Sequence, residues 1–334
     1  MPRELQQRVH EEVVLTKRRS GWPAKQTLAA LGISPRSYYR WRREKAWEQG
    51  PAPPKPVPPY EATAAEKRVV LEYARRHPAL RHRELAWRMV DEGVAGLSPS
   101  TVYRILRENN LVCPWRRRTK RYRAVWEKAS RPDQRWATDL MYVQLLGTTY
   151  YLISFLDEYS RMIVHWELLT NMEGRSLSLA AQAAIESLKR QKGGRLDSPP
   201  EIRTDNGPGY VSMEFRSVLR EHGLGHHRIK PHCPEENGLI ERAHRTLREE
   251  LDGETLTNYW QAQDALDKVI HRYDYQRLHS ALGYLRPIDY YRGDPEQLQA
   301  ARRVKLAEAR HRRREENLKL RQPTLPYPDP AGVT

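Results

Sequence analysis

The fold of the central part of this chain follows from residues 135–169, RWATDLMYVQLLGTTYYLISFLDEYSRMIVHWELL. Apolar and β-branched residues fill three runs in this stretch, at 135–146, 150–160 and 162–169, and Gly-Thr-Thr between the first two is a turn sequence. Runs of this composition separated by short connections are typical of strands that pair with their neighbours in sequence. The stretch therefore predicts three strands of an antiparallel meander.

Helical and strand patterns alternate after the meander. Apolar residues recur at spacings of three and four in three segments, and a short β-like segment separates each from the next. The helical segments are 174–191, 213–223 and 236–250, and the strand-like ones are PEIRTDNGPGY (200–210) and GHHRIKP (225–231). Strands followed by alternating helices and strands predict an α/β core with a mixed five-stranded sheet flanked by helices.

Two segments in the first third of the chain resemble each other. ISPRSYYRWRRE (33–44) and LSPSTVYRILRE (97–108) share Ser, Pro, Tyr, Arg, Arg and Glu at matching positions. In each, the serine can cap a helix whose first residue is the proline. A shorter helical pattern that ends in glycine precedes each one, at 23–32 and 81–93. Each pair of helices predicts a helix-turn-helix unit.

The second helix of a helix-turn-helix enters the major groove of DNA. Because the pattern occurs twice in a basic chain, DNA binding is favoured over a plain helical hairpin with a solvated basic face. The residues expected to contact DNA are Arg36, Tyr39, Arg40 and Arg43 in the first unit and Ser100, Thr101, Arg104 and Arg107 in the second.

The amino-acid composition limits the classes of protein to which this chain can belong. The formal net charge of +16 and the pI near 9.9 indicate a polyanionic partner, with nucleic acid the leading candidate. No run of about 18 apolar residues is present and the N-terminus is polar, so we expect a cytoplasmic, nucleoid-associated protein without a membrane partner. Two cysteines, Cys113 and Cys233, are too few for a disulfide framework or a zinc finger.

Composition also marks the boundaries between domains. GPAPPKPVPPY (50–60) predicts a stiff spacer, and WRRRTKRYR (115–123) is either a solvated linker or, as we favour, a segment that tracks phosphates. The phosphate contacts expected there are Arg116, Arg117, Arg118, Lys120 and Arg121. The predicted order is a helix-turn-helix domain (1–49), the spacer (50–60), a second such domain (61–114), a basic linker (115–130), the α/β core (131–293), and a basic helix with a disordered tail (294–334).

Three carboxylates occupy distinctive positions in the core. Asp139 lies inside an otherwise apolar strand, Asp205 follows a strand at a turn, and Glu241 borders the apolar stripe of its helix. Each alone has an ordinary explanation, such as an ion pair with a nearby arginine or a turn. Three converging carboxylates need cations, and hard oxygen ligands suit Mg²⁺ or Mn²⁺.

The segments around these carboxylates resemble the catalytic core of the DDE transposases of bacterial insertion sequences, which are relatives of retroviral integrase. The matching segments are WATD (136–139), TDNGPGY (204–210), PHCPEENGLIERAHRTL (231–247) and YDYQRLHSALGYLRPIDYY (273–291). The family pattern has 35 residues between its second aspartate and its glutamate, and residues 206–240 supply that number here. The chain lacks the N-terminal zinc-binding His/Cys domain of retroviral integrases.

The resemblance implies a ribonuclease H-like core in which Asp139, Asp205 and Glu241 are catalytic and hold two Mg²⁺ ions, with Mn²⁺ able to substitute. Arg245 and Arg248 would contact phosphates of the reacting strand, or else form surface pairs with Glu249 or Asp252. Water would first free a 3′-OH at the end of the element, and that hydroxyl would then attack another phosphodiester.

The implied function is that of a transposase that binds the terminal inverted repeats of an insertion sequence and cleaves and joins double-stranded DNA at element ends and target. We expect at least a dimer on DNA, because joining two ends requires two active sites. The alternatives are a DNA-binding regulator descended from a transposase and a ribonuclease H-like nuclease that cleaves without joining.

Overall fold

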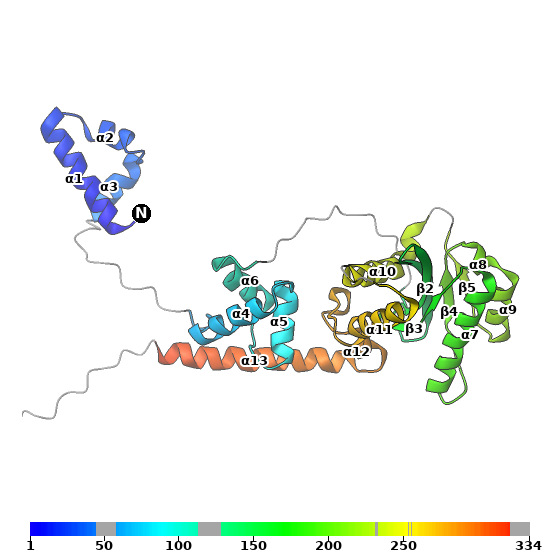
Figure 1. Ribbon diagram of the computed structural model, residues 1–334. Coiled ribbons are helices and arrows are strands. Elements are labelled where there is room, and N and C mark those ends of the chain that lie inside the picture. The colour runs from blue at the N-terminus through cyan, green and yellow to red at the C-terminus, as the bar shows by residue number, and fades with distance from the viewer. Residues whose placement is uncertain (45–57, 113–127, 231–232, 253, 255, 321–334) are drawn as a thin grey trace, which may run out of the picture. The chain divides into compact units, whose positions relative to one another are not determined.

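The computed structural model describes residues 1–44, 58–112, 128–230, 233–252, 254 and 256–320 (Figure 1). The chain forms two compact units, one of Met1–Glu61 with the residues from Glu316 and the other of Ala62–Glu315. Most of the predicted Pro-rich spacer and basic linker, all five predicted phosphate contacts between Arg116 and Arg121, and the predicted disordered tail lie outside the described residues.

A mixed five-stranded sheet forms the centre of the larger unit, as predicted. Its strands lie in the order β3-β2-β1-β4-β5. The pairs β1–β2 and β2–β3 are antiparallel, which confirms the meander, whereas β1–β4 and β4–β5 are parallel. The strands are β1 (Arg135–Leu145), β2 (Thr148–Asp157), β3 (Ile163–Leu169), β4 (Glu201–Thr204) and β5 (His226–Arg228).

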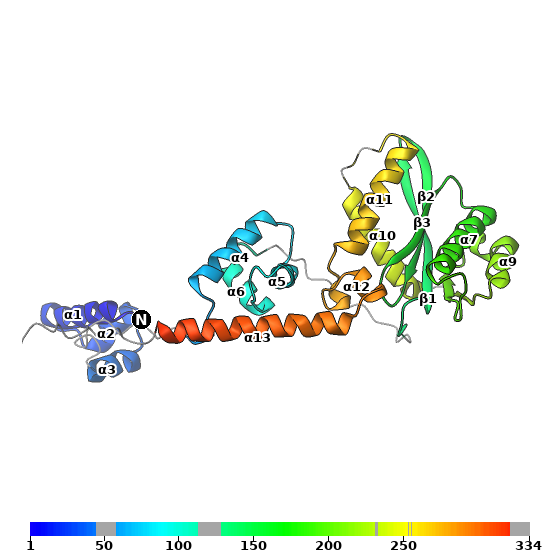
Figure 2. The ribbon, with the colours of Figure 1, turned by 90° about the horizontal axis from the view of Figure 1, so that it is seen from below.

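Helices cover both faces of this sheet (Figure 2). One face packs on α7 (Gly174–Gln191), α8 (Pro208–Val211) and α9 (Met213–Glu221) around Trp136 and Phe155. The other face packs on α10 (Gly238–Leu251) and α11 (Tyr259–Tyr275) around Met141 and Leu152. Side chains alternate between the two faces along each strand, so one strand contributes to both cores. No helix among the described residues is long and apolar enough to cross a membrane.

The N-terminal repeats form two three-helix units. The helices are α1 (Arg3–Ser20), α2 (Ala24–Ala30) and α3 (Pro35–Glu44) in the first unit, and α4 (Ala64–Arg76), α5 (His82–Asp91) and α6 (Pro99–Glu108) in the second. α3 and α6 begin at the predicted prolines, and Ser98 caps α6 by accepting a hydrogen bond from the Thr101 N–H. Gly32 and Gly93 in the preceding turns have φ of +67° and +69°, which favours glycine.

The C-terminal part adds short turns and one long helix. These elements are the 3-10 turns η1 (Pro234–Asn237) and η2 (Ser280–Leu282), α12 (Pro287–Tyr291), and α13 (Pro295–Lys319), which is the predicted basic helix. Arg313 Nη1 on α13 donates to Glu66 Oε1 at 2.7 Å and to the Gly96 carbonyl at 2.8 Å. α13 therefore binds the second three-helix unit through arginines that its sequence would assign to the surface.

Gly96 allows α13 to approach the connection between α5 and α6. A methyl group at this position would collide with Cβ of Ala309. We expect Gly96→Ala to lower the thermal unfolding midpoint of the larger unit, since overpacking costs about 1–3 kcal/mol. Circular dichroism would measure it against Gly238→Ala, whose new methyl group meets open space. Equal midpoints for the two variants would contradict this contact.

Candidate active site

Asp139 lies on the face of the sheet that α10 covers. Ala137 and Met141, two residues to either side of it on β1, both belong to the core beneath α10 and α11. Because side chains alternate along a strand, Asp139 points the same way. Its side chain keeps 21% of its exposure, so it sits at the edge of that core and remains accessible.

His244 fastens α10 to the strand that carries Asp139. Its Nδ1 lies 3.6 Å from Asp139 Oδ2, and its Nε2 shares a 2.7 Å hydrogen bond with Ser154 Oγ. Ser154 on β2 is the register partner of Asp139 on β1, so one ring contacts both strands. The side chain is only 1% exposed. The imidazole therefore holds α10 against the sheet at the aspartate.

Neither His244 nor Ser154 was among the residues expected from the sequence. A signal for the histidine is nevertheless present. Ile240, Ala243 and Leu247 predict the buried stripe of the helix, and position 244 falls inside that stripe at helical spacing. A polar side chain there must find a partner in the core. Which partner it finds depends on the pairing of β1 with β2.

Asp205 lies beside Asp139 because of the parallel pairing of β1 and β4. Ala137 pairs with Arg203, and Asp139 and Asp205 each follow two residues later. Asp205 Oδ1 accepts a 2.9 Å hydrogen bond from the Gly207 N–H. Burial raises the pKa of Asp205, the negative charge of Asp139 raises it further, and the Gly207 N–H opposes the rise. The two carboxylates thus repel each other across adjacent strands, and a bound cation would relieve that repulsion.

Glu241 lies in the first turn of α10 and is exposed. It precedes His244 by three residues, so the two side chains project from nearly the same face of the helix. Within the described residues, however, no three His, Cys, Asp or Glu side chains are grouped closely enough to hold a metal ion. The structure brings Asp139 and Asp205 together and does not bring Glu241 into the same group, although its helix is bound beside them.

The segment that leads into α10 is anchored to β4. Arg203, which is buried, pairs with Glu158 at 2.9 Å and donates to the Glu236 carbonyl at 3.3 Å. Asn206 Nδ2 donates to the Ile229 carbonyl at 2.8 Å. Burial raises the pKa of Glu158, and the neighbouring Arg203 and Arg135 oppose the rise. These contacts tie the start of the Glu241 helix to the strand that precedes Asp205.

The residues predicted to contact DNA are mostly exposed where they are described. On α3, Arg36, Tyr39, Arg40 and Arg43 are exposed, and on α6, Ser100, Arg104 and Arg107 are exposed. Thr101 is half-buried and accepts from Arg104 Nη2 at 3.4 Å. Arg245 and Arg248 are exposed on α10, and in this part of the structure neither forms an ion pair with Glu249 or Asp252.

Comparisons with known proteins find integrase core domains and transposases. Two family models, each described as an integrase core domain, match residues 129–234 and 222–287. The transposase of insertion sequence element IS904 from Lactococcus lactis is 28% identical over 167 residues, which cover 49% of this chain and 63% of that protein. The InsD transposase of the IS2 elements of Escherichia coli is 28% identical over 213 residues, 60% of this chain and 68% of that protein.

A search of solved structures finds a subunit of the simian T-cell lymphotropic virus intasome. The match is 17% identical with a TM-score of 0.44 and covers 80% of both chains. The aligned part of this chain spans less than two thirds of the IS904 transposase. Residues 129–234 and 222–287 thus each match an integrase core domain, and part of the chain is similar to transposases of insertion sequences.

Proposed function

We propose that this protein is a transposase that binds the terminal inverted repeats of an insertion sequence, cleaves DNA at the element ends, and joins those ends to target DNA. The observation that carries the proposal is the position of Asp139 on β1 and of Asp205 directly after the parallel neighbour β4, with the Glu241 helix bound beside Asp139 through His244. Both aspartates are near the sheet surface, where a DNA strand can reach them. The relatives named as transposases support this reading.

The donor set suits a hard divalent cation. Asp139, Asp205 and Glu241 offer only carboxylate oxygens, the ligands that Mg²⁺ and Mn²⁺ prefer. The mutual repulsion of Asp139 and Asp205 is also the electrostatic condition under which a cation binds most favourably. We propose that Glu241 joins the two aspartates when two such ions are bound. The ions would then supply the charge stabilisation that phosphodiester cleavage and transfer require.

The remaining residues have roles in binding DNA. The outer faces of α3 and α6 read base pairs of the element end, and the basic segment around Arg116–Arg121 contacts phosphates independently of sequence. Arg245 and Arg248 follow Glu241 by four and seven residues on α10 and hold phosphates of the reacting strand beside the carboxylates. The protein acts in the cytoplasm, on the nucleoid.

Two other functions make different predictions for the same chain. A regulator descended from a transposase would bind the element ends and leave them uncut. A ribonuclease H-like nuclease would cleave the ends without joining them. Retention of both aspartates at one site argues against the regulator, because a scaffold has no use for two repelling carboxylates. Measuring joined strands separately from cleaved strands distinguishes a nuclease, which only cleaves, from a transposase, which cleaves and joins.

The three carboxylates are expected to act as one unit. Asp139→Asn, Asp205→Asn and Glu241→Gln should each reduce cleavage and joining more than tenfold while end binding stays within about twofold, because losing a metal ligand removes several kcal/mol of transition-state stabilisation. Gel assays with labelled end duplexes in Mg²⁺ would measure the three activities. Asp264→Asn and Glu249→Gln, which change exposed carboxylates elsewhere, are the controls. A variant of the triad that joined ends at more than a tenth of the wild-type rate would remove that residue from the assignment.

Basic residues that contact phosphates and basic residues that read base pairs should differ in how their replacement changes the salt dependence and the sequence specificity of DNA binding. Replacing Arg116, Arg117 and Arg118 by alanine should weaken binding to all DNA and reduce the slope of log K against log salt by about 2.7, since each phosphate contact contributes about 0.9. Arg40→Ala or Arg104→Ala should instead relax discrimination at particular base pairs by about 1–3 kcal/mol. Titrations of specific and random duplexes at several salt concentrations would test both. Identical losses in the two sets would refute the division.

The active species is expected to hold at least two chains. Each chain carries one set of Asp139, Asp205 and Glu241, whereas joining a pair of ends needs two reaction sites. Sedimentation of the protein with and without end duplexes should show two or more chains in the complex that joins ends. Efficient joining by a complex with a single chain would disprove this expectation.

A further inference from the structure

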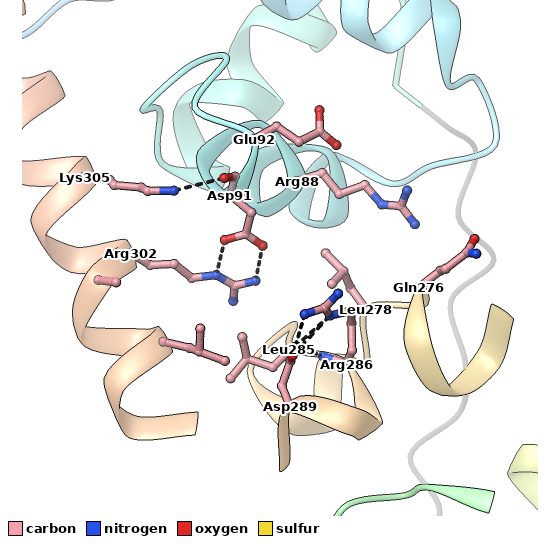
Figure 3. A pocket seen from close by; sticks show the side chains of 12 residues that line it. Arg88, Asp91, Glu92, Gln276, Leu278, Leu285, Arg286, Asp289, Arg302 and Lys305 are labelled. Carbon is pink, nitrogen blue, oxygen red and sulfur yellow. Dashed lines mark hydrogen bonds and ion pairs between the residues drawn. The ribbon is translucent and has the colours of Figure 1, made fainter. Parts of the chain in front are cut away.

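Arg302 of α13 joins the second three-helix unit to the integrase core (Figure 3). Its Nε and Nη2 donate to Asp91 Oδ1 at 2.7 Å and Oδ2 at 2.6 Å, a forked pair with the last residue of α5. The same guanidinium donates to the Gly283 carbonyl at 3.1 Å and the Tyr284 carbonyl at 2.7 Å. The side chain is 3% exposed. One buried side chain of α13 thus contacts both α5 and a turn of the core.

Only arginine has the donors for this arrangement. A guanidinium presents five N–H groups in a rigid plane, and four hydrogen bonds of Arg302 use Nε, Nη1 and Nη2. The acceptor turn is shaped to match, because Gly283 and Tyr284 both adopt left-handed conformations, with φ of +62° and +61°. A lysine ammonium is a single point and cannot reach the carboxylate and both carbonyls in this geometry.

α13 also completes the C-terminal end of α5. Lys305 Nζ donates to the carbonyls of Val90 and Asp91 in the last turn of α5, where carbonyl groups lack the N–H partners of a following helical turn. The guanidinium of Arg302 lies 5.1 Å from the ring centroid of Trp87. The C-terminal end of a helix is negative and Asp91 adds a further negative charge, so the two cations of α13 stabilise it. α5 is therefore held by polar contacts with α13.

A pocket of about 340 Å³ lies where α5, the core and α13 meet, and its lining includes Arg88 from α5, Leu278 and Leu285 from the core and Leu298 from α13. Beside this pocket, the hydrogen bonds of Arg302 connect α13 to α5 and to the core turn, and those of Lys305 connect α13 to α5.

Each end of this connection leads to a functional surface. α5 and α6 share one core, in which Leu85 and Met89 pack with Val102 and Ile105, so holding α5 also holds the exposed face of α6.

On the other side, the turn is closed by the 3.0 Å hydrogen bond from the His279 N–H to the Leu285 carbonyl. In the helix that follows, Tyr291 Oη donates to Asp133 Oδ1 at 2.8 Å. Asp133 lies two residues before the start of β1, the strand of Asp139.

We propose that Arg302 is a positioning residue that sets the number of base pairs between the sequence read by α6 and the phosphodiester that the core cleaves. The inference rests on the proposed function. When the hydrogen bonds of Arg302 are intact, α6 and β1 move as one body, so DNA held by α6 presents a single phosphodiester to the carboxylates. When these hydrogen bonds are broken, α6 still binds its sequence, but neighbouring phosphodiesters also enter the site.

Mapping of cleavage positions at single-nucleotide resolution tests the inference, with end duplexes labelled at one strand and Mg²⁺ present. Wild-type protein should cut mainly at one phosphodiester. Arg302→Met and Arg302→Lys should bind the ends within about twofold and place about tenfold more cuts at neighbouring positions, which corresponds to ~1.4 kcal/mol. Arg88→Met is the matched control, because Arg88 lines the same cavity but pairs with Glu84 on its own helix.

Asp91→Asn covers the possibility that Arg302→Met does not fold. The Asp91 side chain is 41% exposed, so we expect the Asp91→Asn variant to fold. The substitution weakens the forked pair with Arg302, while the two carbonyl contacts of Arg302 remain. It should also scatter the cuts, to a smaller extent. A uniform loss of rate at an unchanged single position, in folded variants that bind the ends, would overturn the inference. Wild-type protein that binds the ends and cuts nothing would refute the proposed function itself, and this inference with it.

Discussion

Strand β1 is hydrogen-bonded along both edges, and the candidate site depends on that double pairing. The parallel pairing with β4 places Asp205 beside Asp139, and the antiparallel pairing with β2 places Ser154 opposite Asp139. Ser154 and Asp139 together receive His244, which brings in α10 and with it Glu241. A shift of one residue in the register of β1 would turn Asp139 to the opposite face of the sheet and separate all of these groups.

The three carboxylates differ in how firmly they are held. Asp139 lies on β1 and Asp205 directly follows β4. The buried ion pair of Arg203 on β4 with Glu158 stabilises the sheet close to Asp205. Breaking such a pair would leave a buried charge uncompensated, so the arrangement is rigid once formed. Glu241 stands exposed in the first turn of α10, whose neighbouring residue Ile240 is buried and whose anchor, His244, is one turn further along.

Part of the basic composition of the chain serves its own architecture. Arg302 and Arg313 are buried on α13 and pair with Asp91 and Glu66 of the second three-helix unit. Buried charged side chains need hydrogen-bond partners, and here the carbonyls of Gly283 and Tyr284 accept from Arg302 and the carbonyl of Gly96 accepts from Arg313. Net charge therefore overstates the surface available to phosphates, and a long polar helix becomes the element that connects the unit carrying α6 with the core.

The amino-acid sequence by itself determined the strands of the meander, the starts of α3 and α6 at their prolines, and the identity and spacing of Asp139, Asp205 and Glu241. Periodicity, capping and turn chemistry are properties of neighbouring residues, so a single sequence expresses them. Only the tertiary structure decided that Asp205 lies next to Asp139, that His244 is buried against both β1 and β2, and that Arg302 binds α5 and the turn at Gly283. These contacts join residues far apart in the chain, and they exist because of strand order, register and helix docking. The local pattern around Arg302 is compatible with a solvated helix face, and burial alone made it a structural anchor, whereas for His244 the sequence places the residue in a buried stripe and leaves its partners undecided.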